Sequence, residues 1–264
     1  MADPVPMLTS PQNDKIKLIR RLQARSRNRH KENKYVIEGV RLCEEALAAG
    51  CKPKLVIFTE GLNQRGEQVV DGFEAIGAEV IQVIPEVMQA ASDTETPQGI
   101  LAVLPLEGKP IPTEVDFVLI PDLLRDPGNM GTLLRTAQAA AVDAVLIPPG
   151  SVDPFSPKVV RAAMGAHFYL PVHKIAWKQI NEIIKTLRLP VFLADAAGGQ
   201  PCYEADFDSP LALVIGGEAS GASNQARKLS PSMVHIPMPG RAESLNAAVA
   251  GAVLLFEVVR QRRK

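Results

Sequence analysis

Residues 211–223 read LALVIGGEASGAS, and this stretch sets the interpretation of the second half of the chain. The expected strand, 211–218, begins fully apolar and runs directly into Gly216, Gly217 and Glu218. Paired glycines let a backbone approach a ligand closely, because they carry no Cβ. The segment therefore predicts a strand that ends at a binding site, although an ordinary strand-end turn with a stray carboxylate also fits it taken alone.

Strands and helices alternate on both sides of this segment. The apolar spacing predicts strands or extended segments at 116–122, 144–149, 168–174, 190–196 and 233–238. It predicts helices at 128–141, 157–166, 177–187, 223–230 and 243–263. This alternation indicates an α/β fold with a parallel sheet covered on both faces. In such sheets ligands bind at the carboxyl ends of the strands.

The first half of the chain predicts a smaller α/β unit. After a basic helix at 11–31, the pattern predicts strands at 35–39, 54–59, 79–84 and 98–105, with helices at 40–50, 66–76 and 85–91. The stretch EGKPIPTE is rich in proline and charge, which is typical of a linker. We therefore expect one domain at 1–106, a linker at 107–114 and a second domain at 115–264.

The composition is that of a globular protein, with 46% hydrophobic and 22% charged residues among 264. An aromatic content of 5% argues against RNA recognition by stacked aromatic platforms. The three cysteines include no close pair, which excludes a zinc ribbon and favours a reducing compartment. No stretch approaches the roughly 20 apolar residues that span a bilayer. We expect a soluble cytoplasmic protein that binds neither a metal nor a membrane.

A formal net charge of zero hides a basic cluster near the amino terminus. Clustered Lys and Arg side chains are the electrostatic signature of phosphate-backbone binding. The candidate RNA-binding residues in this cluster are Arg20, Arg21, Arg25, Arg27, Arg29 and Lys31. A basic helix that merely presents a solvated face remains an alternative.

Two further segments bring polar residues close to strand ends. In PDLLRDPGNMGTLLRTAQAAA (121–141) a helix follows the strand, Asn129 is placed to cap it, and Arg135 lies further along. In HIPMPGRAESLNAAVAGAVLLFEVVRQR (235–262) we expect Ser244 to cap a long helix whose small residues permit close approach of another backbone. Taken singly, these segments also fit a capped helix with a surface arginine and an ordinary buried terminal helix.

The common nucleotide-binding motifs do not occur in the sequence. Residues 216–223 nearly spell a phosphate-binding loop, but Ala222 stands where the loop needs its lysine. The dinucleotide fingerprint G-x-G-x-x-G is missing from the whole sequence. An ATPase and a nicotinamide-dependent dehydrogenase are therefore both disfavoured.

Taken together and in this order, the three segments resemble the three motifs of the SpoU/TrmH branch of the SPOUT methyltransferases. Asn129-x-Gly131-x-x-x-Arg135 resembles the first motif, and Gly216-x-Glu218-x-x-Gly221 resembles the second. Ile236-Pro237-Met238 followed by Ser244-Leu245-Asn246 resembles the third. The resemblance covers residues 116–263.

The first half, with its ending Gln98-Gly99-Ile100, is similar to the RNA-binding extension of several ribosomal-RNA members. That extension has a small α/β fold shared with certain ribosomal proteins. The family resemblance also implies a deep trefoil knot in the C-terminal domain and a homodimer whose sites are completed by the partner chain.

The resemblance implies that S-adenosylmethionine is the methyl donor. The residues expected to hold the donor are Gly216, Gly217, Ile236, Met238 and Leu245. The residues expected to act in catalysis are Asn129, Arg135, Glu218, Ser244 and Asn246. No metal is implied.

The reaction implied is methyl transfer to the 2′-hydroxyl of a ribose in structured RNA. A hydroxyl is a weak nucleophile, so its growing negative charge needs stabilisation. Because arginine stays protonated, we interpret Arg135 as an electrostatic stabiliser rather than a base. The N-terminal domain favours ribosomal RNA of the large-subunit, 23S type. Methylation of transfer RNA, and a non-catalytic RNA-binding protein of ribosome assembly, remain alternatives.

Overall fold

The computed structural model describes residues 7–196, 198–217, 221–230 and 232–263. Glu218, one of the expected catalytic residues, lies outside the described residues. The chain divides into two compact units. The first comprises residues 1–107 and 155–168, and the second comprises 108–154 and 169–264. Residues 155–168, which the sequence analysis placed in the second domain, thus cluster with the first unit.

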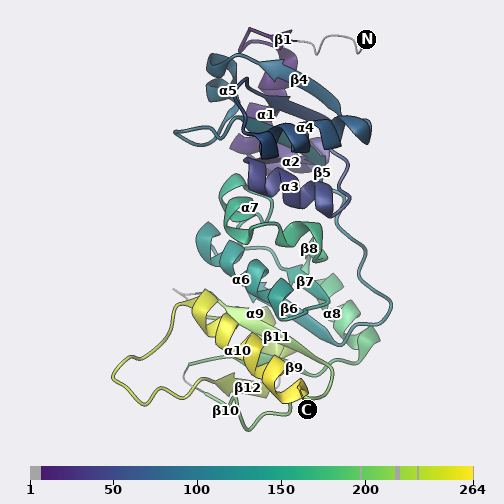
Figure 1. Cartoon of the computed structure of the whole chain (residues 1–264). Helices are drawn as coiled ribbons and strands as arrows, with labels where there is room; N and C mark the ends of the chain where they lie inside the picture. Colours follow the sequence, from purple (N-terminus) through teal and green to yellow (C-terminus); the bar gives the residue numbers. More distant parts are fainter. Residues whose placement is uncertain (1–6, 197, 218–220, 231, 264) are drawn as a thin grey trace. The chain divides into compact units, whose positions relative to one another are not determined.

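The first unit is a small α/β structure around a mixed sheet, in the order β1-β4-β3-β5-β2 over the described residues (Figure 1). Its strands are β1 (Met7–Leu8), β2 (Lys34–Glu38), β3 (Leu55–Phe58), β4 (Glu79–Val83) and β5 (Ile100–Pro105). Its helices are α1 (Asp14–Ala24), α2 (Ser26–Glu32), α3 (Val40–Ala48), α4 (Gln64–Ala75), α5 (Pro85–Ala91) and α7 (Pro157–Ala163). Strand β5 runs antiparallel to both β2 and β3, which alternation alone did not predict.

The expected single basic helix at 11–31 is wrong, because the chain forms two helices that meet at Arg25. Arg25 is extended (φ −142°, ψ 132°), which ends α1 and lets α2 begin in a new direction. The last carbonyls of a helix lack intrahelical partners. The Asn28 side chain donates to the Arg21 carbonyl at 2.9 Å, and the Arg29 guanidinium donates to the carbonyls of Leu22 and Gln23. These two side chains of α2 therefore stabilise the end of α1.

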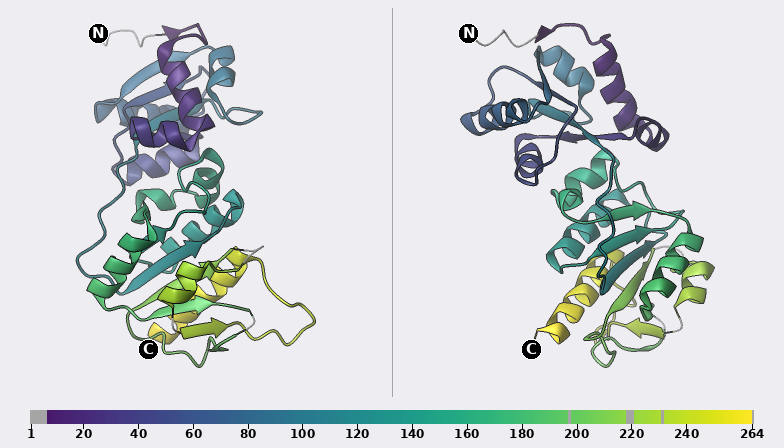
Figure 2. Two further views of the ribbon diagram at one scale, coloured as in Figure 1. Left: turned by 180° about the vertical axis from the view of Figure 1, so that it is seen from behind. Right: turned by 90° about the vertical axis from the view of Figure 1, so that its right-hand side faces the viewer.

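Helices α1 and α5 cover one face of the first sheet, and α3 and α4 lie on the other (Figure 2, right view). The apolar side of α1 consists of Ile16, Ile19 and Leu22, all fully buried. Residues spaced by three lie on one helical face, which explains why this short polar helix docks on the sheet. The basic residues of α1 are left on its outer surface.

The second unit is built on a sheet in which every strand pairing among the described residues is parallel. The strand order is β10-β12-β9-β11-β6-β7-β8. The strands are β6 (Phe117–Asp122), β7 (Ala144–Ile147), β8 (Val172–Lys174), β9 (Val191–Ala194), β10 (Gln200–Pro201), β11 (Leu211–Gly216) and β12 (Ser232–His235). The helices are α6 (Pro127–Ala139), α8 (Trp177–Leu187), α9 (Asn224–Leu229) and α10 (Ala247–Arg262). The parallel α/β sheet expected from the sequence is thus confirmed.

Helices α6 and α10 lie on one face of this sheet, and α8 and α9 lie on the other (Figure 2, right view). Strand β11 is central and buried from Leu211 to Ile215. Helix α10 comes close to α6 because Gly251 faces Leu133, where an added Cβ would lie 2.5 Å from Leu133 Cδ1. Burial on both faces explains the continuous apolar sequence of the central strand.

Two helix starts differ from the sequence expectation. Helix α6 is capped by Asp126, whose Oδ1 accepts from the Asn129 amide at 2.7 Å, so Asn129 is not the cap. Helix α10 begins at Ala247 and is capped by Asn246, whose Oδ1 accepts from the amides of Ala248 and Val249. Ser244 therefore lies in the preceding loop and does not cap the helix.

No described helix is both long and apolar enough to cross a bilayer. Nor do the described residues bring three or more His, Cys, Asp or Glu side chains together as a metal-binding group.

Candidate functional site

A pocket of about 260 Å³ opens where β9, β11 and β12 end. The residues that line it directly follow or close these strands, at Ala194–Ala196, Ile215–Gly217 and Val234–Ile236. The loop before α10 and the first turns of that helix complete the wall. This position at the carboxyl edge of a parallel sheet is the expected place for a ligand in an α/β protein.

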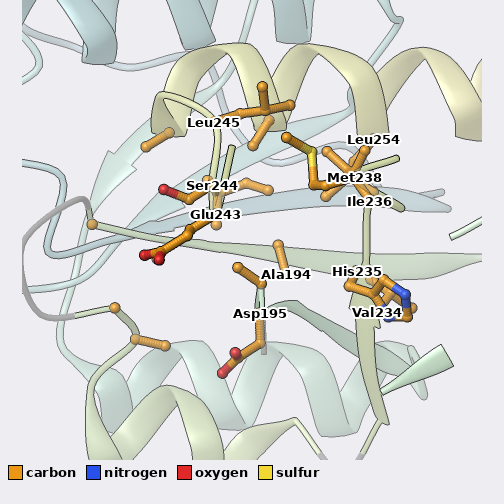
Figure 3. Close-up of a pocket in the computed structure, with 18 of the residues that line it drawn as sticks. Ala194, Asp195, Val234, His235, Ile236, Met238, Glu243, Ser244, Leu245 and Leu254 are labelled. Carbon is orange, nitrogen blue, oxygen red and sulfur yellow. The ribbon is translucent and has the colours of Figure 1, made fainter. Parts of the chain in front are cut away.

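The wall is mostly apolar, with a few polar side chains. In Figure 3, Ile236, Met238, Leu245 and Leu254 lie beside α10, Glu243 and Ser244 lie next to Leu245, and Asp195 lies across from them. Ala247 and Ala250 also line the pocket from the helix, so small side chains leave room beside α10. An apolar pocket with a few polar groups, near the lower end of the roughly 300–1,000 Å³ typical of ligand sites, suits a nucleoside-sized molecule.

The five residues expected to hold a donor all line this one pocket. They come from two separate parts of the chain, β11 with its following turn and the loop before α10: Gly216, Gly217, Ile236, Met238 and Leu245. Ser244 and Glu243 line it as well. The fold thus brings the second and third sequence motifs together around a single cavity.

The glycines of β11 allow a close passage of backbone past backbone. A Cβ on Gly217 would lie 2.2 Å from the Leu123 carbonyl oxygen, and one on Gly216 would lie 2.9 Å from the Ala222 amide nitrogen. Contacts below 3.0 Å with backbone atoms cannot be relieved by a side-chain rotation. Both positions therefore require glycine for steric reasons.

Asp122 of the neighbouring strand β6 forms a hydrogen bond to Ser223, which follows the loop after β11. It closes β6, is fully buried, and pairs in register with Gly216. Its Oδ2 accepts a hydrogen bond from the Ser223 amide at 2.6 Å. Ser223 in turn caps α9, its hydroxyl oxygen accepting from the Ala226 amide at 3.2 Å. Hydrogen bonds to carboxylates are among the stronger ones in proteins, so Asp122 holds the described ends of the loop in place.

The first motif does not line the pocket, and a hydrogen bond connects it to the site. Asn246 Nδ2 donates to Asn129 Oδ1 at 3.1 Å, which joins the start of α10 to the first turn of α6. Arg135 lies two turns further along α6 and is exposed, and it does not line the pocket of its own chain. The structure therefore connects Asn129 and Asn246 and leaves Arg135 at the surface.

Sequence reasoning missed three polar residues of the pocket wall, Asp195, Arg227 and His235. Arg227 Nη1 donates to Asp195 Oδ2 at 2.8 Å, so the two form an ion pair at the rim. Asp195 directly follows β9, and Arg227 is in α9. The signal was present, because Asp195 is a polar residue at the carboxyl end of a predicted strand, as in the three chosen segments.

The cysteines take no part in this pocket. Burial raises the pKa of the Cys43 thiol, with the Glu38 charge adding to the effect. Burial also raises the pKa of Cys202, with a smaller contribution from Glu257. A raised pKa keeps a thiol protonated and unreactive. Both side chains act as small apolar groups.

The predicted basic cluster lies on α1 and α2, and five of its six residues are exposed. Arg20, Arg21 and Arg25 line an open groove with Lys17, Asn28, Ala24 and Asp14. Arg27 and Lys31 are exposed on α2. Arg29 is the exception, since it is 3% exposed and its guanidinium is committed to the end of α1. The expectation that Arg29 contacts RNA is therefore replaced by a structural role.

Parallel strands that carry a nucleoside-sized pocket at their carboxyl ends define an α/β protein with a cofactor-type site. The chain belongs to the SpoU rRNA Methylase family, whose model matches residues 116–256. A second model, for the MRM3-like substrate binding domain, matches residues 13–102. The family predicted from the three motifs is thus confirmed.

Among characterised relatives, the chain is 33% identical to the 23S rRNA (guanosine(2553)-2′-O)-methyltransferase RlmP of Bacillus subtilis, over 95% of this chain and 98% of the relative. Among solved structures, it is similar to an AdoMet-bound rRNA methyltransferase from Sinorhizobium meliloti, with 29% identity, a TM-score of 0.87, and coverage of 98% and 99%. The SpoU methyltransferase AviRb of Streptomyces viridochromogenes in complex with AdoMet aligns with 26% identity, a TM-score of 0.84, and coverage of 95% and 99%. Membership of this group fits the trefoil knot expected from the sequence.

Proposed function

We propose that the protein transfers a methyl group from S-adenosylmethionine to a ribose 2′-hydroxyl of ribosomal RNA, of the large-subunit, 23S type. The observation that carries the proposal is the single pocket at the carboxyl ends of β9, β11 and β12, in a chain of the SpoU family. The names of its relatives, which specify 2′-O-methylation of 23S rRNA and AdoMet binding, support both substrate and donor.

The residues of the pocket fit S-adenosylmethionine. The size of the pocket and its apolar side chains suit an adenosine. Backbone at the strand-end residues Gly216 and Ile236, and at Leu245 in the loop before α10, offers hydrogen-bonding groups for the base and ribose. Gly217 and Met238 would complete the contact surface. When bound, S-adenosylmethionine supplies an electrophilic methyl on sulfonium.

We assign to Arg135 the stabilisation of the negative charge that develops on the attacking ribose hydroxyl. A guanidinium gives several fixed N–H donors and a permanent charge, which stabilise a developing alkoxide and grip the adjacent phosphate. Asn129 and Ser244 would orient the ribose, and Asn246 would order the site through its hydrogen bond to Asn129. Glu218 would hold the loop or Arg135 by charge-assisted hydrogen bonds.

A homodimer explains why Arg135 lies outside the pocket of its own chain. An exposed arginine on α6 can complete the pocket of a second copy across a two-fold interface. Helix α10, which packs against α6, carries an exposed apolar row of Val249, Val253 and Phe256, which are 49%, 41% and 48% exposed. An apolar row on one helical face is the kind of surface that a dimer buries. We therefore assign the dimer contact to α6 and α10.

Mixing two inactive variants tests this shared site. Arg135→Ala removes the guanidinium, and Gly217→Val blocks the pocket. If each site combines both chains, a co-refolded equal mixture regains about a quarter of wild-type activity, because half the dimers are mixed and each has one intact site. No recovery, with mixed dimers demonstrated by a tag, would show that Arg135 acts on its own pocket.

The two halves of the chain take separate roles in this proposal. Residues 1–106 bind RNA, with Arg20, Arg21, Arg25, Arg27 and Lys31 as the contacts to phosphate, and 115–264 carry out the transfer after a linker at 107–114. The match to a substrate-binding domain at 13–102 supports this division. A cytoplasmic location without membrane attachment is part of the proposal, and the similarity to a bacterial 23S rRNA methyltransferase supports it.

The experiment that tests the function is transfer of radiolabelled methyl to unmodified ribosomal RNA and, separately, to bulk transfer RNA. We expect label in ribosomal RNA that survives alkali as a methylated dinucleotide. Label in transfer RNA alone would contradict the assignment of ribosomal RNA as the substrate. Absence of label from both, with the donor bound, would favour a non-catalytic role in ribosome assembly.

A further inference from the structure

A second basic groove lies in the second unit, between α8 and α9. It has a volume of about 970 Å³, and its lining residues belong to α8, α9, the segment that leads into β9, and the first residue of β9. Helices α8 and α9 lie on the sheet face opposite α10 (Figure 2, right view). The groove therefore lies on the other side of the sheet from the apolar row assigned to the dimer, and it shares no lining residue with the donor pocket.

The charged side chains that line this groove are all positive. Four cations line it, Lys178, Lys185, Arg188 and Lys228, and no carboxylate is among its lining residues. All four are exposed, and none forms an ion pair with another described residue. The chain as a whole has equal numbers of acidic and basic residues. A local excess of this kind creates a positive potential that attracts a polyanion.

Helix α8 holds its share of these charges on one rigid face. Lys178, Asn181 and Lys185 recur at helical spacing, Arg188 follows as the C-cap in a left-handed conformation (φ 55°), and all four line the groove. From Lys178 to Lys185 the row is about 10 Å long at 1.5 Å per residue, and Arg188 extends it beyond the end of the helix. A row of that length suits a chain of phosphates better than a single small anion.

The apolar residues of α8 are committed to the core. Ile180 and Ile184 are 0% and 4% exposed and belong to the core cluster of the second unit, and Ile184 also lines the groove. A membrane-binding helix needs a free apolar face to insert. That requirement is not met by α8, so a lipid surface is disfavoured as the partner.

An aromatic side chain completes the groove. Trp177, the single tryptophan of the sequence, is half-buried at its edge. Unpaired bases of RNA stack on aromatic rings, while cations hold the backbone. Exposed cations together with an aromatic ring therefore favour single-stranded or looped RNA.

We propose that the groove between α8 and α9 is a second RNA-contact surface, which binds a strand of the substrate RNA away from the methylated nucleotide. This inference rests on the proposed function for the choice of RNA as the polyanion. It predicts that the groove contributes to the KM for RNA and leaves the KM for the donor and kcat unchanged.

Trp177 provides a direct reading of occupancy, because its emission is the only tryptophan signal of the chain. A titration of the full-length protein with a ribosomal RNA fragment should quench this emission, with a midpoint near the KM for the same RNA. Unchanged emission at RNA concentrations that saturate turnover would overturn the proposal.

Charge reversal supplies the second test. Lys185→Glu with Arg188→Glu should raise the KM for RNA about 10-fold or more, and lower the slope of log KM against log salt by about 1.4, at 0.7 per lost contact to a single strand. The matched control, Lys174→Glu with Arg263→Glu, makes the same charge change at an exposed lysine and an exposed arginine of the second unit that lie outside both grooves. An unchanged KM in the groove variant, or an equal rise in the control, would overturn the assignment.

The two proposals fail in different ways. If the wild-type protein quenches with RNA but transfers no methyl, the proposed function fails and the groove remains an RNA site. If methyl transfer is intact and insensitive to the groove variants, the function stands and the groove proposal fails. Quenching by an acidic polypeptide but not by RNA would assign the groove to a protein partner and overturn the proposal as well.

Discussion

Two strands of this chain end in a buried carboxylate, and the two ends differ in what surrounds them. Glu38 closes β2, and the hydroxyls of Ser92 and Thr94 donate to its Oε1 at 2.7 and 2.8 Å. The next residue, Gly39, is covered by the Gln98 side chain, so close that a Cβ would lie 2.3 Å from Gln98 Oε1. Side chains thus fill the space beyond β2.

Asp122 closes β6 in the second unit, and a backbone amide takes the place of the hydroxyls. The Ser223 amide donates to Asp122 Oδ2 at 2.6 Å. The loop tied in this way follows β11, whose end lines the pocket with Gly216 and Gly217. The comparison teaches that a polar residue at a strand end does not mark a site by itself. A site is marked instead by a glycine-lined turn that a hydrogen bond to the carboxylate holds in place, with its backbone beside a cavity.

We expect catalysis to depend on residues of the second unit, and Arg135→Ala should have the largest effect. We expect kcat to fall about 100-fold or more, because a charge stabiliser of the transition state is lost. The donor Kd should stay within twofold, since Arg135 does not line the pocket. Single-turnover kinetics and calorimetry separate the two effects. Loss of donor binding would instead make this arginine structural.

The glycines of the two strand ends should respond differently to substitution. Gly217→Ala places a Cβ against the Leu123 carbonyl, so we expect donor affinity to fall at least 10-fold through displacement of the loop. Gly39→Ala, at φ +100° and against a movable glutamine, should lower the melting temperature while donor affinity stays unchanged. Equal loss of donor affinity in both variants would remove the distinction drawn between the strand ends.

The two strand-end carboxylates, Asp122 and Glu38, should also respond differently to substitution. Asp122→Ala should raise the donor KM about 10-fold by releasing the loop, and Asp122→Asn should do less, because an amide oxygen still accepts from Ser223. Glu38→Ala should cost about 1–3 kcal/mol of stability without changing the donor KM, because it leaves Ser92 and Thr94 without their acceptor. Chemical denaturation and initial-rate kinetics on the same preparations provide both readings. A raised donor KM for the Glu38 variant would contradict this pairing.

The smallest of these effects concerns two arginines of the basic cluster. Arg25→Ala removes an exposed charge, so the KM for RNA should rise a few-fold with stability unchanged. Arg29→Ala removes the donors to the Leu22 and Gln23 carbonyls, so stability should fall by about 1–3 kcal/mol. Thermal melts and RNA titrations distinguish them. If Arg29→Ala weakened RNA binding with an unchanged melt, its structural assignment would be wrong.

Periodicity predicted nearly every helix and strand of this fold, because amphipathic spacing is local information. Strand pairing is not local, and the antiparallel β5 of the first sheet was missed for that reason. The break at Arg25 was missed because it depends on two side chains of α2 that reach back to α1. The start of α10 was set too early, since Ser244 and Asn246 are equally good caps and tertiary contacts select Asn246.

Residues of the second and third motifs meet in one pocket, whereas contacts between side chains far apart in the sequence were not predicted. Gly216, Ile236 and Leu245 come together in one pocket, as their motifs indicated. The ion pair of Asp195 with Arg227 joins residues 32 apart in sequence, and neither residue forms part of a motif. The burial of Arg29 could not be predicted either, because a basic residue in a basic segment is expected to be exposed unless its contacts in the fold are known.

The central claim is that the glycine-lined pocket of the second unit holds the methyl donor. Calorimetric titration of S-adenosylmethionine into wild-type protein, Gly217→Val and Glu38→Gln tests it most directly. We expect one site per chain in the wild type and in Glu38→Gln, and no measurable binding to a Gly217→Val protein whose circular dichroism is native. Undiminished binding to folded Gly217→Val, or its loss in Glu38→Gln alone, would contradict it.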